Sequence, residues 1–215
     1  MEYDFLTWLG HASFLIKSKG LNIFIDPYKI GEMREKADLI FITHPHRDHF
    51  SEEDIAKIAK ADTQFVGPKE VIEKLGQVKG TVVAPGDRGK ILGIHYEAVA
   101  AYNIAPEKLE FHKRESGWVG FVIEVEGKRI YHPGDTDLIE DMKNIKVDLA
   151  LIPCGGKYTM NIEEAIRATR LIDAKNFAPM HYKALLGDEK SRKLEEKFVE
   201  SVNSAIILKE WAGTD

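Results

Sequence analysis

The chain has 215 residues, of which 44% are hydrophobic and 30% are charged, and its formal net charge is −5. This length supports one substantial core and is short for two, so we expect a single domain over residues 1–215. The mildly acidic balance disfavours a nucleic-acid partner, because phosphate binding needs a basic face. With one cysteine, Cys154, no disulfide can form within the chain.

The first residues and the distribution of apolar residues bear on localisation. The sequence starts without the charged and apolar regions of a signal peptide, and no apolar run approaches membrane-spanning length. We therefore expect a cytoplasmic protein that acts on a small molecule and has no membrane partner. Assembly into a homo-oligomer is left open by the sequence.

Strand-like patterns dominate the first forty residues. We expect strands over residues 3–8, 13–17, 21–25 and 39–42. Ser51 is followed by three acidic residues and then by apolar residues at helical spacing, which predicts a helix capped by Ser51. A second, short helix is expected after Pro68, ending near Leu75.

The rest of the chain alternates strands with helices. We expect strands over residues 94–101, 118–125, 128–132, 148–153, 176–180 and 205–208, a loop over 102–117 and a helix over 189–199. Asn161 and Glu164 have the spacing of a capping box, which predicts a helix running to about Ile172. Two runs of strands that each end in helices favour two sheets packed face to face with helices outside.

Residues 43–50 read Thr-His-Pro-His-Arg-Asp-His-Phe and carry the strongest functional signal. Imidazole nitrogens and a carboxylate oxygen are ligands that suit zinc and similar divalent metals. The segment follows an apolar, strand-like run, and α/β sheets place their chemistry at such strand ends. The sequence therefore predicts a metal site here; the competing interpretation is a polar loop with solvated histidines.

Three later segments also end an apolar strand on polar residues or glycines. Asp135 follows a strand and a glycine turn, and His181 stands at the end of another strand. Cys154 precedes the glycine pair Gly155-Gly156, and we interpret it as a small buried apolar residue rather than a nucleophile.

These motifs, in this order, resemble the metallo-β-lactamase superfamily. The similarity extends from Gly10-His11 to His181-Tyr182, and residues 8–14, 130–137 and 155–160 carry its local details. Locally it is most similar to the metal-dependent hydrolase branch that includes the L-ascorbate-6-phosphate lactonase. The resemblance implies an α+β, four-layer αβ/βα sandwich of two mixed sheets flanked by helices, with a dinuclear metal site.

The resemblance also implies a set of ligands for Zn²⁺ or Mn²⁺, with one or two ions per chain. His44 and His46 would bind the first metal. The second metal would be bound by Asp48, His49 and His181. Asp135 would bridge the two metals.

One position departs from the family pattern. Asn103 stands where the third histidine of the first metal is expected, and an amide oxygen is a weaker zinc ligand than imidazole. Three alternatives follow: a first site that is weak or empty, a replacement ligand such as His11 or His112, or a preference for a harder metal such as manganese.

The sequence thus predicts a metal-dependent hydrolase in which metal-bound hydroxide cleaves an ester, lactone or phosphodiester of a small, anionic substrate. Asp48 would orient the attacking water and accept its proton. The alternatives are a nuclease or phosphodiesterase acting on nucleic acid, against which the net charge of −5 argues, and a metal-binding protein without hydrolytic activity.

The remaining polar residues have both functional and structural interpretations. The resemblance favours His11 as a catalytic residue, a proton donor or substrate contact, over a structural histidine. Candidate substrate contacts are Tyr102, Asn103, His112, Tyr158 and Lys183. For the last of these the alternative is a solvated lysine, and for His112 a surface histidine on a polar loop.

Overall fold

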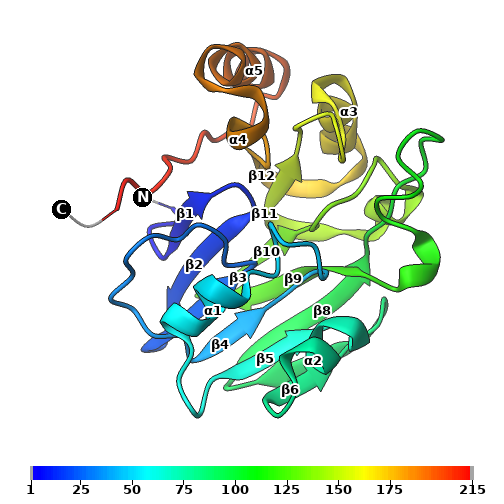
Figure 1. Cartoon of the computed structure of the whole chain (residues 1–215). Helices are drawn as coiled ribbons and strands as arrows, with labels where there is room; N and C mark the ends of the chain where they lie inside the picture. Colours follow the sequence, from blue (N-terminus) through cyan, green and yellow to red (C-terminus); the bar gives the residue numbers. More distant parts are fainter. Residues whose placement is uncertain (1, 214–215) are drawn as a thin grey trace. The chain divides into compact units, whose positions relative to one another are not determined.

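A computed structural model of the chain describes residues 2–213 and contains two six-stranded mixed sheets, each with helices of its own (Figure 1). The first sheet belongs to a unit formed by residues 2–83 and 209–213, and the second to a unit formed by residues 84–208. The expected α+β fold with two mixed sheets and flanking helices is confirmed. The single domain over residues 1–215 stays a prediction.

The first sheet combines antiparallel and parallel pairing. Its strands, in order across the sheet, are β1 (Leu6–Gly10), β2 (Ser13–Ser18), β3 (Leu21–Ile25), β4 (Leu39–Phe41), β5 (Gln64–Gly67) and β6 (Lys79–Val82). The strands from β1 to β3 pair antiparallel, and those from β3 to β6 pair parallel. The carboxyl ends of β3 and β4 therefore lie at the same edge, where the motif that follows β4 begins.

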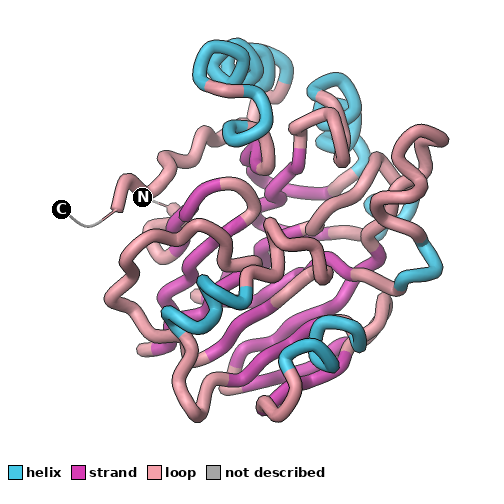
Figure 2. The backbone as a smooth tube through the Cα atoms, viewed as in Figure 1, coloured by secondary structure: helices cyan, strands magenta, loops and turns pink. Residues whose placement is uncertain are grey.

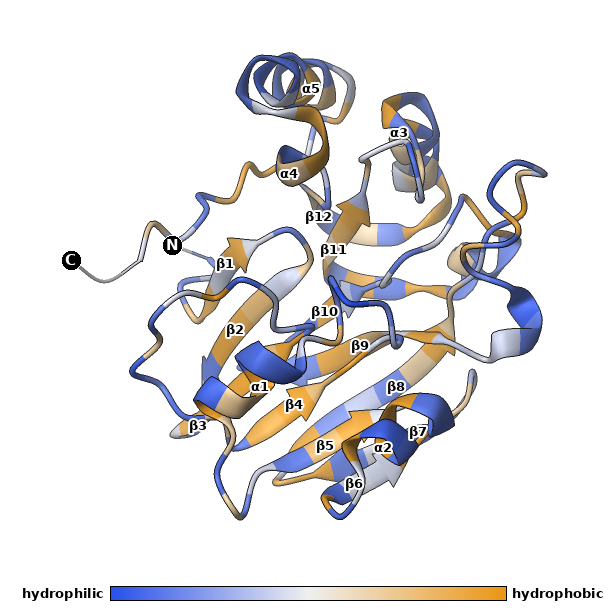
Figure 3. Cartoon of the chain, in the orientation of Figure 1, coloured by the Kyte–Doolittle hydropathy of each residue, from blue (hydrophilic) through white to orange (hydrophobic). Residues whose placement is uncertain are grey.

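Two helices of the first unit cross between its parallel strands. Helix α1 (Glu52–Ile58) joins β4 to β5, and α2 (Lys69–Leu75) joins β5 to β6. Their apolar side chains form one core cluster with one face of the sheet, whose members include Phe24, Ile40, Ile55, Phe65 and Val71. The predicted cap is confirmed, since Ser51 Oγ accepts from the Asp54 amide. Figure 3 shows the apolar strand β4 and the polar outer surface of α1.

Residues 209–213 return to the first unit and cover its edge strand β1. The Trp211 amide donates to the Trp8 carbonyl over 2.8 Å, and Trp8 and Glu210 form a parallel bridge. The Trp211 side chain packs against the same core cluster. The first unit is therefore built from two stretches of sequence that the second unit separates.

The second sheet repeats the mixture of pairings. Its strands, in order across the sheet, are β12 (Asp173–Met180), β11 (Lys146–Pro153), β10 (Lys128–His132), β9 (Val119–Val125), β8 (Ile94–Ala100) and β7 (Arg88–Ile91). The pairs from β7 to β10 are antiparallel, and β10, β11 and β12 are parallel. The carboxyl ends of these last three strands meet at one edge, which is where Asp135 and His181 follow in the sequence.

The helices of the second unit follow its strands. They are α3 (Ile162–Leu171), α4 (Lys183–Leu186) and α5 (Asp188–Ser201), with the short 3₁₀ helices η1 (Arg114–Ser116) and η2 (Glu140–Asn144). The predicted capping box is confirmed, because Asn161 and Glu164 exchange side-chain and backbone hydrogen bonds at the start of α3. Apart from η1, the segment between β8 and β9 is loop, as Figure 2 shows.

The structure corrects several strand predictions. Three short strands, β5, β6 and β7, were not predicted, because each has few apolar residues and depends on backbone pairing with a neighbour. The strand predicted over 205–208 is wrong: Ala205 forms only an isolated bridge with Phe177. The first strand begins at Leu6, whose amide bonds the Tyr3 carbonyl in a turn.

No helix among residues 2–213 is both long and apolar enough to cross a membrane.

Candidate metal centre

The first unit brings four candidate ligands together in the turn after β4. The amides of His49 and Phe50 both donate to the His46 carbonyl, which coils residues 46–50 tightly. His44 and His49 are buried, whereas His46 and Asp48 are partly exposed. The ligand atoms of His44 lie within 4.8 Å of those of His46 and His49. This part of the chain can therefore present several imidazoles and a carboxylate to one or two ions.

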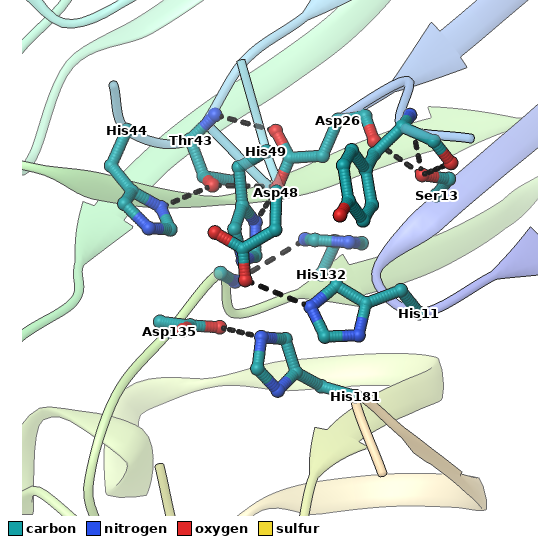
Figure 4. Close-up of polar contacts among 12 residues, drawn as sticks. His11, Ser13, Asp26, Thr43, His44, Asp48, His49, His132, Asp135 and His181 are labelled. Carbon is teal, nitrogen blue, oxygen red and sulfur yellow. Dashed lines mark hydrogen bonds and ion pairs between the residues drawn. The ribbon is translucent and has the colours of Figure 1, made fainter. Parts of the chain in front are cut away.

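Asp26, the residue after β3, orients two of these histidines. Its fully buried carboxylate accepts from the Thr43 amide (2.8 Å), the Thr43 hydroxyl (2.6 Å) and His49 Nδ1 (2.7 Å) (Figure 4). The Thr43 hydroxyl has one proton, which it donates to the carboxylate, so it accepts from His44 Nδ1 at 2.9 Å. Both imidazoles therefore carry their proton on Nδ1 and present the Nε2 lone pair.

Sequence reasoning did not identify Asp26. The available signal was an acidic residue directly after an apolar strand and before a proline. Its role depends on the parallel pairing of β3 with β4, in which Ile25 stands opposite Phe41 and Asp26 therefore reaches Thr43. Hydrogen-bonded carboxylates behind histidine ligands are common in metal sites, where they set ring orientation and basicity.

The two predicted catalytic residues, His11 and Asp48, are in contact. His11 Nε2 lies 3.0 Å from Asp48 Oδ2 (Figure 4). His11 has a φ of 50° in the turn between β1 and β2, and its carbonyl accepts from Trp8 Nε1. The ligand atoms of His11, Asp48 and His49 all lie within 4.8 Å of one another. His11 thus holds the partly exposed carboxylate of Asp48 close to His49, in the turn formed by residues 46–50.

In the second unit, two imidazoles converge on Asp135. His181 Nε2 lies 3.2 Å from Asp135 Oδ1, and His112 Nε2 lies 3.5 Å from Asp135 Oδ2. All three side chains are buried. His112 Nδ1 lies 2.6 Å from Asn103 Oδ1. Because an amide oxygen only accepts, Nδ1 carries the proton, and His112 presents its Nε2 lone pair towards the carboxylate.

Two glycines let the backbone of this unit come close to the candidate ligands. A Cβ atom on Gly120 of β9 would lie 2.7 Å from the Pro133 backbone, just before Asp135. A Cβ on Gly155 would collide with the His181 carbonyl oxygen and with the Leu185 side chain. Any side chain at these positions would therefore displace a segment that carries a candidate ligand.

The candidate substrate contacts have different surroundings. Tyr102 is buried and donates to Asp141, and burial with this hydrogen bond raises the pKa of its phenol, which stays protonated at neutral pH. Tyr158 is half-buried, and its carbonyl accepts from Asn103 Nδ2. Lys183 begins α4 and forms an ion pair with Glu195 at 3.7 Å. Of these five residues, His112 contacts Asp135, and Asn103 is hydrogen-bonded to His112.

Two further histidines and the cysteine have surroundings that give them no part in the candidate site. His132 is fully buried, and its Nδ1 accepts from the Gly134 amide, which shapes the turn before Asp135. His95 is exposed on β8. Burial raises the pKa of the Cys154 thiol, which disfavours the thiolate and agrees with a small apolar role.

The fold has counterparts in known proteins. A family model described as the beta-lactamase superfamily domain matches residues 5–181, and the chain has the metallo-β-lactamase fold. It is 33% identical to a UPF0173 metal-dependent hydrolase from Nanoarchaeum equitans, covering 92% of this chain and 94% of the relative. A second, from Methanobrevibacter smithii, is 32% identical, covering 94% and 91%. The chain belongs to the UPF0173 metal-dependent hydrolase family of this superfamily.

Two solved structures are similar over nearly the whole chain. One, provisionally described as a metal-dependent hydrolase from Parabacteroides distasonis, has a TM-score of 0.84 at 31% identity, covering 96% of this chain and 93% of that one. The other is Igni18, described as a novel metallo hydrolase from Ignicoccus hospitalis, with a TM-score of 0.75 at 27% identity, covering 95% and 94%.

Proposed function

We propose that this chain hydrolyses a small substrate with the help of one or two divalent metal ions, held by histidine and carboxylate side chains. The observation that carries the proposal is the hydrogen-bond acceptor beside Nδ1 of three buried histidines. Hydrogen bonds hold the proton of His44, His49 and His112 on Nδ1, and each therefore presents Nε2 as a ligand. Imidazole with carboxylate is a donor set that fits zinc, and manganese is the alternative where oxygen ligands dominate.

The proposal assigns His112 as the third ligand of the first metal, together with His44 and His46. Asn103, which occupies the expected position of that ligand in the sequence, is not a ligand. The Asn103 amide oxygen already accepts from His112 Nδ1, so its role is to orient that ring. Asp48, His49 and His181 would hold the second metal, and Asp135 would be a ligand that the two share. Of the three alternatives that the sequence left open, the proposal adopts the replacement ligand.

The residues around Asp48 perform the proton chemistry. When bound, a divalent metal would supply Lewis acidity, which lowers the pKa of its bound water to about 7. The Asp48 carboxylate is partly exposed, so it can orient water and accept its proton. His11 fixes this carboxylate by its 3.0 Å contact and can return a proton to the leaving group.

We extend the proposal to the substrate, an ester, lactone or phosphodiester that carries an apolar group. The Asn103 amide donates to the His112 carbonyl, and Ile104 and Phe111 are the chain neighbours of these two residues. Both are exposed, as is Leu109. The Phe111 ring packs edge-on against Tyr158. A substrate with an apolar substituent could cover these side chains while its scissile group meets the metal.

The experiment that tests the function combines metal analysis with a substrate panel. Purified chain, stripped of metal and then reloaded with Zn²⁺ or Mn²⁺, is assayed against lactones, phosphodiesters, carboxylic esters and thioesters. We expect metal-dependent hydrolysis of at least one class, lost in His49→Ala and kept in His95→Ala, which removes an exposed histidine outside the candidate site. Equal metal content in these two variants would contradict the ligand assignment.

Asn103→Ala should weaken one metal site and spare the other. Without the amide oxygen, His112 loses the partner that holds its ring and its tautomer, and loss of such partners typically lowers metal affinity about 10- to 100-fold. Cobalt titration followed by visible spectroscopy measures the two affinities separately. Asn203→Ala, at an exposed turn, is the control. An unchanged titration would show that Asn103 does not orient a ligand.

Phe111→Ser should discriminate between substrates. We expect about a tenfold fall in kcat/KM for a substrate with a long acyl chain, which corresponds to ~1.4 kcal/mol of lost apolar contact, and little change for the acetyl analogue. Val199→Ser removes a comparably exposed apolar side chain from α5 and serves as the control. Equal effects on long and short substrates would rule out the apolar contact.

A further inference from the structure

A buried lysine lies at the centre of the loop that carries His112. Lys108 is 5% exposed, and its ammonium donates to Asp137 Oδ1 (3.0 Å) and to the Thr159 carbonyl (2.8 Å). Glu164 Oε2 lies 3.5 Å away. Burying an ammonium and a carboxylate costs free energy, and such a pair gives little net stability compared with apolar side chains of similar volume. This pair therefore calls for an explanation other than stability.

Asp137 anchors the start of the same loop, at residues 102–105, through hydrogen bonds. Its second carboxylate oxygen accepts from the amides of Ile104 (2.9 Å) and Ala105 (3.0 Å), and its own amide donates to the Tyr102 carbonyl (3.0 Å). The preceding residue, Thr136, adds hydrogen bonds between its hydroxyl and the backbone of Tyr102. Residues 102–105 are thus joined directly to the two residues that follow Asp135.

These contacts continue to the candidate ligand. Asn103 lies within residues 102–105 and forms two hydrogen bonds with His112. The Asn103 amide donates to the His112 carbonyl (2.8 Å), and His112 Nδ1 donates to the Asn103 side-chain oxygen (2.6 Å). Lys108, between the two, joins the loop to residues 159 and 164. The position of His112 relative to Asp135 is therefore set by hydrogen bonds that centre on Lys108 and Asp137.

We propose that Lys108 and Asp137 form a buried clamp that positions His112 for metal binding. Both are positioning residues, since neither contacts the candidate ligand itself. The inference rests on the proposed function, because it takes His112 as a ligand. It explains why a charged pair is buried here: a lysine that reaches three acceptors on two segments specifies one loop geometry, whereas apolar side chains would allow several.

The test is a double-mutant cycle on the full chain with Co²⁺ as the probe. Lys108→Met removes the ammonium at similar length, and Lys108→Met/Asp137→Asn also avoids leaving an unpaired buried charge. We expect both to bind metal about 10- to 100-fold more weakly at one site and unchanged at the other. In a His112→Ala background the same changes should have no further effect on metal binding, because the clamp acts through His112. Lys193→Met, which breaks an exposed pair with Glu189, is the control.

A second measurement is independent of metal. In the metal-free protein, hydrogen exchange of the Ile104 and Ala105 amides should accelerate about tenfold or more in Lys108→Met, while the amides of β11 stay protected. Unchanged exchange and unchanged metal affinity would overturn the clamp. Equal losses in the parent and His112→Ala backgrounds would also overturn it, since they would indicate a general effect on folding.

The two proposals fail in different ways. If His112→Ala binds both metals as tightly as the parent, the ligand assignment is wrong, and the clamp does not position a ligand even if exchange accelerates. If His112→Ala loses a metal and Lys108→Met does not, the assignment stands and the clamp is wrong.

Discussion

Asp135→Ala should lose metal and lower kcat/KM by about 10³-fold or more, which corresponds to ~4 kcal/mol of transition-state stabilisation. The carboxylate faces His181 Nε2 with one oxygen and His112 Nε2 with the other, at 3.2 and 3.5 Å. Under the proposed assignment, the substitution would remove the carboxylate that offsets the positive charge of the bound metals and would leave His181 and His112 with an incomplete ligand set. Metal content by elemental analysis and hydrolysis by the reloaded protein are the two readouts.

Two comparison variants make the Asp135 result specific. Asp135→Asn keeps the shape of the side chain and removes its charge, so we expect a metal content between those of the parent and Asp135→Ala. Asp173→Ala removes an exposed carboxylate at the start of β12 and should change neither readout. If Asp135→Ala keeps the parent's metal content, the carboxylate is not a ligand, whatever happens to activity.

Asp26→Ala should have the second largest effect, and it should reduce both stability and metal affinity. The substitution leaves the Thr43 amide, the Thr43 hydroxyl and His49 Nδ1 buried without their acceptor. Each such loss typically costs 1–3 kcal/mol, so we expect a fall of about 3–5 kcal/mol in the free energy of unfolding of the metal-free protein. Denaturant unfolding measures this change.

Asp26→Asn separates orientation of the histidine from stability. The amide retains one acceptor oxygen for Thr43 but offers N–H groups to His49, which favours the tautomer with its proton on Nε2. That tautomer has no lone pair on the nitrogen that would bind the metal. We expect a folded protein, less than about 2 kcal/mol below the parent, with metal affinity reduced about 100-fold. A variant that titrates with metal like the parent would show that Asp26 only stabilises the turn.

Much of the candidate site could be predicted from the sequence because its residues follow strands. The histidine motif after β4, Asp135 after β10 and His181 after β12 each follow a strong apolar run. The carboxyl ends of parallel strands meet at one edge of a sheet, so Asp135 and His181, which follow strands of the same sheet, become neighbours. Residue type and position after a strand were therefore enough to single out these positions, and the resemblance to the superfamily supplied their predicted roles as ligands.

Other features depended on pairings that the sequence does not encode locally. Asp26 becomes a partner of His49 only when β3 and β4 pair in parallel at one particular register. Lys108 looks like a solvated loop lysine until residues 137 and 159 fold around it. The strands β6 and β7, Lys-Gly-Thr-Val and Arg-Gly-Lys-Ile, have too weak a pattern to identify and form because a neighbouring strand supplies their hydrogen bonds.

The return of Trp211 to strand β1 has a consequence for biosynthesis. A ribosome releases residues 84–208 as one uninterrupted stretch, whereas the edge of the first sheet is covered only after Trp211 has emerged. The first unit, although most of its residues are synthesised first, is therefore completed only after the whole second unit has been made. Until then the nascent protein exposes the backbone of Trp8 at an unprotected sheet margin, which is a hazard for misassociation between polysomal chains.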